Sequence, residues 1–460
     1  MPLCFYMNTE LLSPAGSLKN MRYAFAYGAD AVYAGQPRYS LRVRNNEFDH
    51  DNLKIGIDEA HALGKKFYVV VNIQPHNSKL KNFIRDIEPI IAMQPDALIM
   101  SDPGLIMMVR EHFPDMQIHL SVQANAINWA TVKFWKDYGL SRVILSRELS
   151  LEEIEEIQKH VPEIELEVFV HGALCMAYSG RCLLSGYMNK RDANQGACTN
   201  ACRWEYRIHD AKEDANGDVI PVQQLDEPKQ CCSNSGSEDT TQTVLVQRND
   251  EEMFAAEEDE HGTYFMNSKD LRAVQHVDRL THMGVASLKI EGRTKSYFYC
   301  ARTAQIYRKA IDDALSGKAF DQSLMHQLEG LANRGYTEGF LRRHIHSDYQ
   351  NYEDGSSHFD YQQFCGEALE RHGDYVRIEV KNRFLVGDSL ELMTPKGNIS
   401  FVLEHMRDLK GNSIDNAKGS GHIVEILLPQ DIDIAYALLI RNLPHAKEQL
   451  QSSALAYAAN

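Results

Sequence analysis

The chain has 460 residues, with 48 Lys and Arg against 64 Asp and Glu, so its formal net charge is −16 at pH 7. A chain of this length is longer than a domain with a single hydrophobic core usually is, so we expect two or three domains. Its content of 43% hydrophobic and 24% charged residues excludes a disordered chain. Nine cysteines in no regular framework argue against a secreted disulfide protein. The first residues, MPLCFYMNTELLSPAG, hold no basic segment before an apolar run, and no run could span a bilayer, so we expect a cytoplasmic protein without a membrane partner.

Short apolar runs alternate with helical patterns through the first 315 residues. The runs begin at Glu10, Ala29, Lys66, Asp96, Ile118, Arg142, Glu167 and Ser287. Between them, apolar residues recur three and four positions apart, as on one face of a helix. The runs are apolar on both faces, as buried parallel strands are. Eight such strands predict an α/β fold, a (β/α)8 TIM-like barrel, with an open doubly wound sheet as the alternative.

A group of four cysteines follows the seventh predicted strand: Cys175, Cys182, Cys198 and Cys202. Six, fifteen and three residues separate the successive members. Four convergent thiolates can hold an iron–sulfur cluster or a zinc ion. Structural zinc usually takes tighter spacings, which only the last pair shows, so we favour a [4Fe-4S] cluster. Four reduced thiols that never meet are the alternative.

Composition divides the chain into four regions. Residues 1–204 form the first part of the barrel with the cysteine loop, and residues 205–262 read as a long acidic insertion, with disorder in parts of it left open. Residues 263–345 complete the barrel and add helices. Short alternating runs in residues 362–445 predict a small C-terminal all-β barrel, which serves either as packing or as a docking site for substrate or RNA.

Polar residues follow the predicted barrel strands, at positions that face the active-site mouth of a TIM barrel. Two arginines could bind carboxylate or phosphate, and carboxyl and imidazole groups could transfer protons. The catalytic candidates are Arg147, Glu148, His171, Glu291 and Arg293, and the substrate-binding candidates are Asn72, Gln123 and Lys289. A purely structural role for His171 is equally open, and solvation of the barrel rim is the alternative for the others.

The segment EVFVHGALCMAYSGRCLLS resembles the signature of the collagenase-like peptidase family, whose class name records an unassigned catalytic mechanism. The similarity extends through SPAGS, GADAVYAG, NSKDL and SLKIEGRTKS and covers nearly the whole chain. The long form with GACTNACRWEY and RGYTEGFLRRH is similar to the branch associated with tRNA hydroxylation. Other branches are implicated in 23S ribosomal RNA hydroxylation and in oxygen-independent ubiquinone hydroxylation.

That resemblance implies an enzyme that forms 5-hydroxyuridine at the wobble position of tRNA, without molecular oxygen. It implies prephenate as the hydroxyl-donor cosubstrate and a cysteine-bound [4Fe-4S] cluster. Cys175 and Cys182 match the signature pair, and Cys198 matches a third ligand. The expected place of the fourth, near residues 267–270, holds no cysteine, so Cys202 substitutes by position.

Two other functions stay open. One is a peptidase, as the family name says, although neither HExxH nor GxSxG occurs in the chain. The other is a non-catalytic accessory protein that binds RNA. Of these observations, the acidic net charge agrees least with RNA binding, because contacts with phosphate require basic side chains. A local cluster of basic side chains is nevertheless sufficient to bind RNA.

Overall fold

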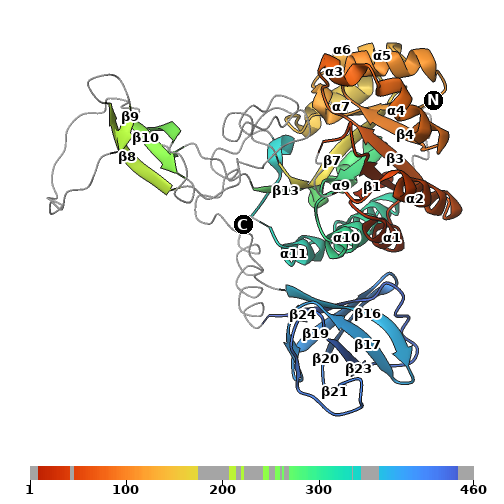
Figure 1. Ribbon diagram of the computed structural model, residues 1–460, viewed down its shortest axis with the longest axis vertical. Coiled ribbons are helices and arrows are strands. Elements are labelled where there is room, and N and C mark those ends of the chain that lie inside the picture. Colours follow the sequence, from red (N-terminus) through yellow and green to blue (C-terminus); the bar gives the residue numbers. More distant parts are fainter. Residues whose placement is uncertain are drawn as a thin grey trace.

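A computed structural model of the chain describes residues 9–41, 46–174, 269–333, 335–342 and 362–443, and the backbone of five strands between residues 207 and 263. Its largest part is a barrel of parallel strands surrounded by helices, and an antiparallel β domain packs beside it (Figure 1). No helix in the described part of the chain is long and apolar enough to cross a lipid bilayer.

Eight parallel strands close the barrel. They are β1 (Glu10–Pro14), β2 (Ala31–Gly35), β3 (Lys66–Val71), β4 (Ala97–Met100), β5 (Ile118–Leu120), β6 (Arg142–Ile144), β7 (Glu165–Ala173) and β14 (Ser287–Ile290). Each pairs with the next, and β14 pairs with both β7 and β1. All eight coincide with the apolar runs of the sequence. The predicted TIM-like barrel is therefore confirmed, and the open sheet was the wrong alternative.

Helices that connect the strands, together with two helices that follow β14, lie on the outside of the barrel (Figure 1). They are α1 (Leu18–Ala26), α2 (His50–Ala62), α3 (Asn77–Leu80), α4 (Phe83–Ala92), α5 (Pro103–His112), α6 (Trp129–Asp137), α7 (Leu151–His160), α9 (Val277–His282), α10 (Tyr297–Leu315) and α11 (Ser323–Glu329). Short polar residues start several of them: Ser150 and Glu153 form a capping box at α7, and Asp102 accepts from the Leu105 amide at α5. These caps fix where each helix leaves the barrel mouth.

The chain between β7 and β14 contains strands that the sequence analysis did not predict. β8 (Arg207–Glu213), β9 (Val219–Pro221), β10 (Gln242–Gln247), β11 (Phe254–Asp259) and β12 (Gly262–Thr263) form an antiparallel sheet. β13 (Asp270–Arg272) then pairs antiparallel with β7, and β15 (Tyr336–Thr337) pairs with β13. These short strands lie in a stretch rich in Glu, Asp, Gln, Asn and Ser, so the sequence analysis predicted only a polar insertion there.

The C-terminal region is an antiparallel all-β domain, as predicted. Seven strands pair in the order β20 (Gly397–Val402), β19 (Ser389–Thr394), β24 (Leu438–Asn442), β16 (Gln362–His372), β17 (Tyr375–Val380), β23 (Ile423–Leu427) and β21 (Met406–Arg407). A second pair joins β18 (Phe384–Leu385) to β22 (Asn416–Ala417). The domain has its own apolar core, yet Met393, Leu438 and Ile440 belong to the core of the barrel. Those three side chains bury one edge of the domain against the barrel.

Candidate active site

A pocket opens at the carboxyl ends of the barrel strands, where the active sites of TIM barrels lie. Its wall combines apolar strand residues with polar residues of the loops that follow them. Six of the eight side chains that the sequence places at this mouth line the pocket: Asn72, Gln123, Arg147, Lys289, Glu291 and Arg293. The structure thus brings three cations, one carboxylate and two amides together around one cavity.

Arg147 follows β6 and is held by contacts on both sides of its guanidinium. Its Nη1 donates to the Ala173 carbonyl at 3.0 Å, and its Cζ lies 3.8 Å from the centroid of the Phe169 ring. Its Nη2 lies 3.8 Å from Oε2 of Glu291. A guanidinium that is both stacked and hydrogen-bonded keeps one orientation, so Arg147 is prepared to receive a carboxylate or a phosphate.

Arg293 reaches the same pocket from the loop after β14. Its Nη2 donates to the Leu41 carbonyl at 2.8 Å, and its Cζ lies 5.9 Å from the centroid of the Tyr33 ring. Gly35, the last residue of β2, leaves space for this side chain, because a Cβ there would lie 2.7 Å from Nη1 of Arg293. A glycine at this strand end is therefore part of the site, a point that the sequence alone did not indicate.

Lys289 lies inside the barrel on β14, only 3% exposed, and forms an ion pair with Glu167 of β7. Its Nζ is 2.7 Å from Oε1 of Glu167 and 4.1 Å from the centroid of the Tyr33 ring. Burial lowers the pKa of Lys289; Glu167 opposes this shift, and the nearby Arg293 adds to it. The pocket therefore contains an amine that gives up its proton more easily than an ordinary lysine.

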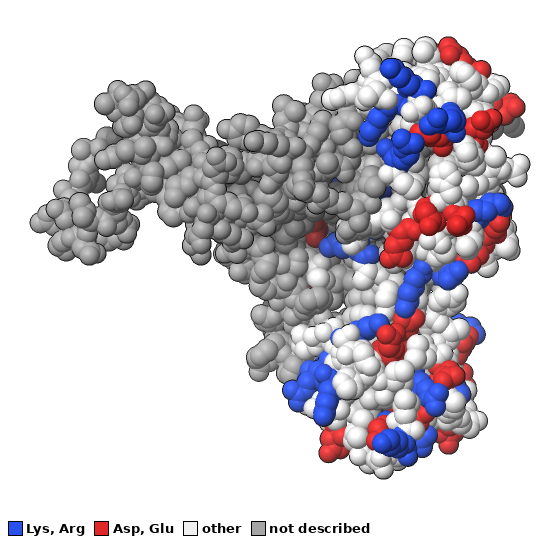
Figure 2. All heavy atoms as spheres, in the orientation of Figure 1, with Lys and Arg blue, Asp and Glu red and all other residues white. Residues whose placement is uncertain are grey.

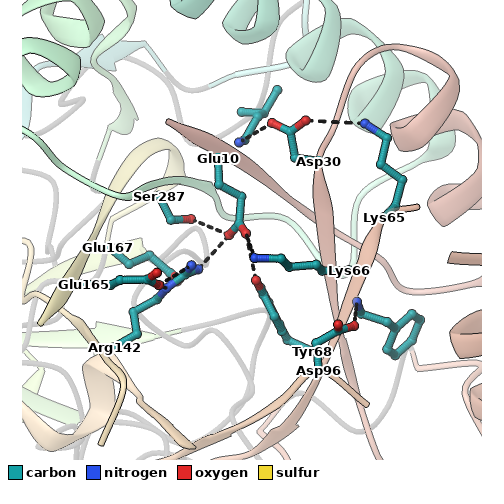
Figure 3. Close-up of polar contacts among 12 residues, drawn as sticks. Glu10, Asp30, Lys65, Lys66, Tyr68, Asp96, Arg142, Glu165, Glu167 and Ser287 are labelled. Atoms are coloured by element: carbon teal, nitrogen blue, oxygen red, sulfur yellow. Dashed lines mark hydrogen bonds and ion pairs between the residues drawn. The ribbon is translucent and has the colours of Figure 1, made fainter. Parts of the chain in front are cut away.

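Glu167 also belongs to a group of charged side chains in the amino-terminal halves of the barrel strands (Figure 3). Arg142 Nη1 lies 3.1 Å from Glu167 Oε2 and 2.6 Å from Glu10 Oε1, and Glu10 also accepts from the Tyr68 hydroxyl at 2.7 Å. Burial raises the pKa of Glu10, but the Arg142 ion pair and the hydrogen bonds outweigh it, so that this pKa is lowered. The partner of Lys289 is thus itself anchored by Arg142.

His171 does not line the pocket. Strict alternation along β7 would place it on the same face as Phe169, but Lys289 pairs with Phe169 and Ile290 with His171, so the register shifts by one residue. A bulge of this kind re-aims the side chain that follows it. His171 is buried with Nδ1 3.3 Å from the Tyr307 hydroxyl, and burial lowers its pKa to about 3. These contacts fit the structural role that the sequence left open rather than proton transfer at the mouth.

Glu148 also lies apart from the pocket, since it accepts a hydrogen bond from the Ser146 hydroxyl and is absent from the pocket wall. The sequence analysis did not identify Tyr33 and Phe169, whose aromatic rings shape the cavity, or the carboxylate of Glu167. The available signal was a charged residue between apolar neighbours in a strand, at Glu167 as at Lys289.

The four predicted cluster ligands, Cys175, Cys182, Cys198 and Cys202, lie outside the described residues. Within the part that is described, Cys300 and Cys365 are buried, and no group of three or more His, Cys, Asp or Glu side chains could hold a metal ion. The cysteine segment begins directly after Leu174, next to Ala173, whose carbonyl accepts from Arg147. The chain therefore enters this segment at the mouth of the pocket.

Comparison with known proteins shows which family the chain resembles. The model of peptidase family U32 matches residues 16–351, and that of the peptidase family U32 C-terminal domain matches residues 360–441. The tRNA hydroxylation protein P of Escherichia coli strain K12 is 68% identical over 95% of this chain and 99% of that protein. The protein of the same name from Haemophilus influenzae is 68% identical over 94% of this chain and 96% of its own length. The 23S rRNA 5-hydroxycytidine C2501 synthase of Escherichia coli is 27% identical over 85% of this chain and 53% of that protein. The chain belongs to peptidase family U32.

Proposed function

We propose that this protein is a cytoplasmic RNA-modifying enzyme that hydroxylates tRNA, forming 5-hydroxyuridine at the wobble position. One observation carries the proposal: two relatives that share 68% of their residues with this chain, over almost their entire lengths, are named tRNA hydroxylation protein P. The more distant relative that is named for 5-hydroxycytidine in ribosomal RNA supports the same reaction class on a different RNA.

The cysteine segment supports a redox mechanism. A hydroxyl group on a pyrimidine ring requires oxidation, which side chains alone do not perform, and a [4Fe-4S] cluster supplies electron transfer when bound. Four thiolates are the donor set that such a cluster takes, so Cys175, Cys182, Cys198 and Cys202 would hold it. Their segment starts at the mouth of the pocket, beside the Ala173 carbonyl and Arg147.

The pocket supports an anionic cosubstrate, for which prephenate is the candidate. Arg147 and Arg293 would each receive one carboxylate, and the buried Lys289 adds a third positive group. The rigid contacts of Arg147 with Ala173 and Phe169 orient the ligand without further rearrangement. Outside the pocket, basic and acidic side chains are interspersed on the face of the molecule that Figure 2 shows, so RNA binding would rely on local basic groups and not on the net charge.

The first test is nucleoside analysis of tRNA from a bacterial strain that lacks its own wobble-uridine hydroxylase. Expression of this chain should restore 5-hydroxyuridine, and expression of a Cys175→Ala, Cys182→Ala variant should not. The wild type, purified without oxygen, should contain about four irons per chain, which the variant loses. Unmodified tRNA in the presence of folded, iron-containing protein would exclude the proposal and favour the peptidase. Restored modification by the cysteine variant would favour an accessory role.

A further inference from the structure

We propose that Lys289 is a nucleophilic amine that forms an imine with the carbonyl carbon of a 2-oxo acid bound in the barrel-mouth pocket. This inference deepens the proposed function and rests on it for the assignment of the pocket to an anionic cosubstrate. The imine itself requires neither RNA nor a cluster. It can therefore be tested separately from tRNA hydroxylation.

The position of Lys289 meets the first requirement, an amine that faces a ligand cavity. Lys289 lines the pocket, and its Nζ lies over the Tyr33 ring at 4.1 Å and over the Phe169 ring at 5.4 Å from the centroids. The two rings and the ion pair with Glu167, at 2.7 Å, hold the amine in one place at the floor of the cavity. A lysine fixed in this way loses little further conformational freedom when it reacts with a carbonyl carbon.

A second requirement is that the amine can lose its proton, because only the neutral form attacks a carbonyl. Desolvation and a neighbouring cation activate lysine nucleophiles in this manner. Lys289 is 3% exposed, and Arg293 stands near enough to disfavour its charge. Glu167 is in contact with Nζ and can accept the proton, and its other oxygen stays paired with Arg142 at 3.1 Å.

The surroundings of Lys289 indicate the class of carbonyl compound. Arg147 and Arg293 line the same pocket, and a planar carboxylate is the group that guanidinium binds in two-point fashion. The cavity volume is about 70 Å³, roughly five to seven water positions at 10–15 Å³ each, and the cavity is open at the barrel mouth. This volume suits a carboxylate with an adjacent carbonyl, and the open mouth of the pocket leaves room for a larger substituent on the ligand. A 2-oxo acid places its carbonyl carbon next to a carboxylate that one of these arginines would hold.

The reaction is a condensation that needs no oxidant or reductant. The Lys289 ammonium passes one proton to Glu167, and the nitrogen lone pair forms a bond to the carbonyl carbon while the carbonyl π pair moves to oxygen. That oxygen takes up the second proton of the nitrogen, which gives a neutral carbinolamine. Glu167 then returns the first proton to the hydroxyl, which leaves as water as the protonated imine (iminium) forms. The resulting iminium withdraws electrons from the carbons beside it.

Reductive trapping tests the proposal. The full-length protein would be incubated with pyruvate and sodium cyanoborohydride, without tRNA, and the labelled peptide identified by mass spectrometry. We expect one adduct per chain, on the peptide that contains Lys289. Lactate, which has the same carboxylate but no carbonyl, should give none. No adduct, or adducts spread over exposed lysines, would overturn the proposal whatever the outcome of the tRNA assay.

Two variants separate the chemistry from the fold. Lys289→Arg keeps a cation beside Glu167 but cannot form an imine, so it should abolish the adduct while circular dichroism and the melting temperature stay close to the wild type. Lys66→Arg is the matched control, since Lys66 contacts the same charged network at 3.6 Å from Glu10 and is half exposed. It should leave trapping unchanged. An adduct that persists in Lys289→Arg would show that another lysine reacts.

Discussion

His171 shows how the environment of one residue makes the stability of the whole fold depend on pH. Burial lowers the pKa of this histidine from 6.5 to about 3, so the folded protein keeps it neutral while the unfolded chain protonates it below pH 6.5. The unfolded state therefore binds more protons between these values, and the free energy of unfolding falls as the pH falls, by up to about 1.4 kcal/mol per pH unit from this residue.

Replacement of His171 by Asn should reduce this acid sensitivity. The amide can still bond to the Tyr307 hydroxyl, which lies 3.3 Å from Nδ1, but it does not titrate. Urea unfolding of both proteins at pH 7 and pH 4.5 measures the effect. We expect the wild type to lose more stability than His171→Asn over this interval, even where the variant is less stable at pH 7. An equal loss in both would place the acid-sensitive group elsewhere.

For single residues, the residue type and its position at the end of a strand were sufficient to predict part of the pocket. Arg147 and Arg293 follow buried strands, and the closed barrel brings those strand ends around one cavity. The orientation of His171 depends on a bulge that arises only from pairing with β14. The contact of Lys289 with Glu167 was not predictable for a similar reason, since it joins residues 122 positions apart.

Among the elements, the strands β1, β6, β7 and β14 are tied together by charge as well as by backbone pairing. Arg142 is 3% exposed at its side chain and contacts Glu10, Glu165 and Glu167 at 2.6, 2.7 and 3.1 Å. Two of these carboxylates are buried, so the guanidinium balances charge that water does not reach (Figure 3). Breaking such a group by removal of one partner leaves uncompensated charge inside the barrel.

We therefore expect Arg142→Met to lower the free energy of unfolding by about 3–5 kcal/mol, the range for a buried pair that loses one member. Denaturant unfolding measures this loss. The matched control is Arg279→Met on α9, because Arg279 pairs with Glu152 at 2.9 Å but is 44% exposed, and exposed pairs contribute about 0–1 kcal/mol. If both variants lowered the free energy of unfolding by similar amounts, burial would not explain the contribution of the Arg142 ion pairs.

The elements themselves were predictable to different degrees. Barrel strands are buried on both faces, so they leave continuous apolar runs in the sequence, such as KFYVVV in β3. Strands that contain many polar residues do not show a continuous apolar run in the sequence. RIHDAKE in β8 and FAAEED in β11 contain several charged residues, and they pair with β10 on either side. This pairing joins separate segments of the chain, so local composition does not reveal it.

In the whole molecule, the C-terminal domain is attached to the barrel by contacts of two kinds. Tyr27 donates to the Met393 carbonyl at 2.9 Å, and Met393 itself belongs to the barrel core. Arg302 on α10 is 1% exposed and pairs with Glu391 at 2.9 Å, whereas Lys19 on α1 is 44% exposed and pairs with Glu367. Because the domains share an apolar core and a buried ion pair, we expect them to unfold as one thermodynamic unit.

This arrangement predicts that the intact protein unfolds in a single thermal transition, and that Arg302 contributes far more to it than Lys19. Arg302→Ala leaves Glu391 without its cation at a largely dry interface, so we expect a loss of about 3 kcal/mol and the appearance of a second transition as the domains uncouple. Lys19→Ala removes an exposed partner of the same interface and should cost less than about 1 kcal/mol. Differential scanning calorimetry distinguishes the two cases. Two transitions already in the wild type would show that the domains unfold independently, because a shared core requires both to open together.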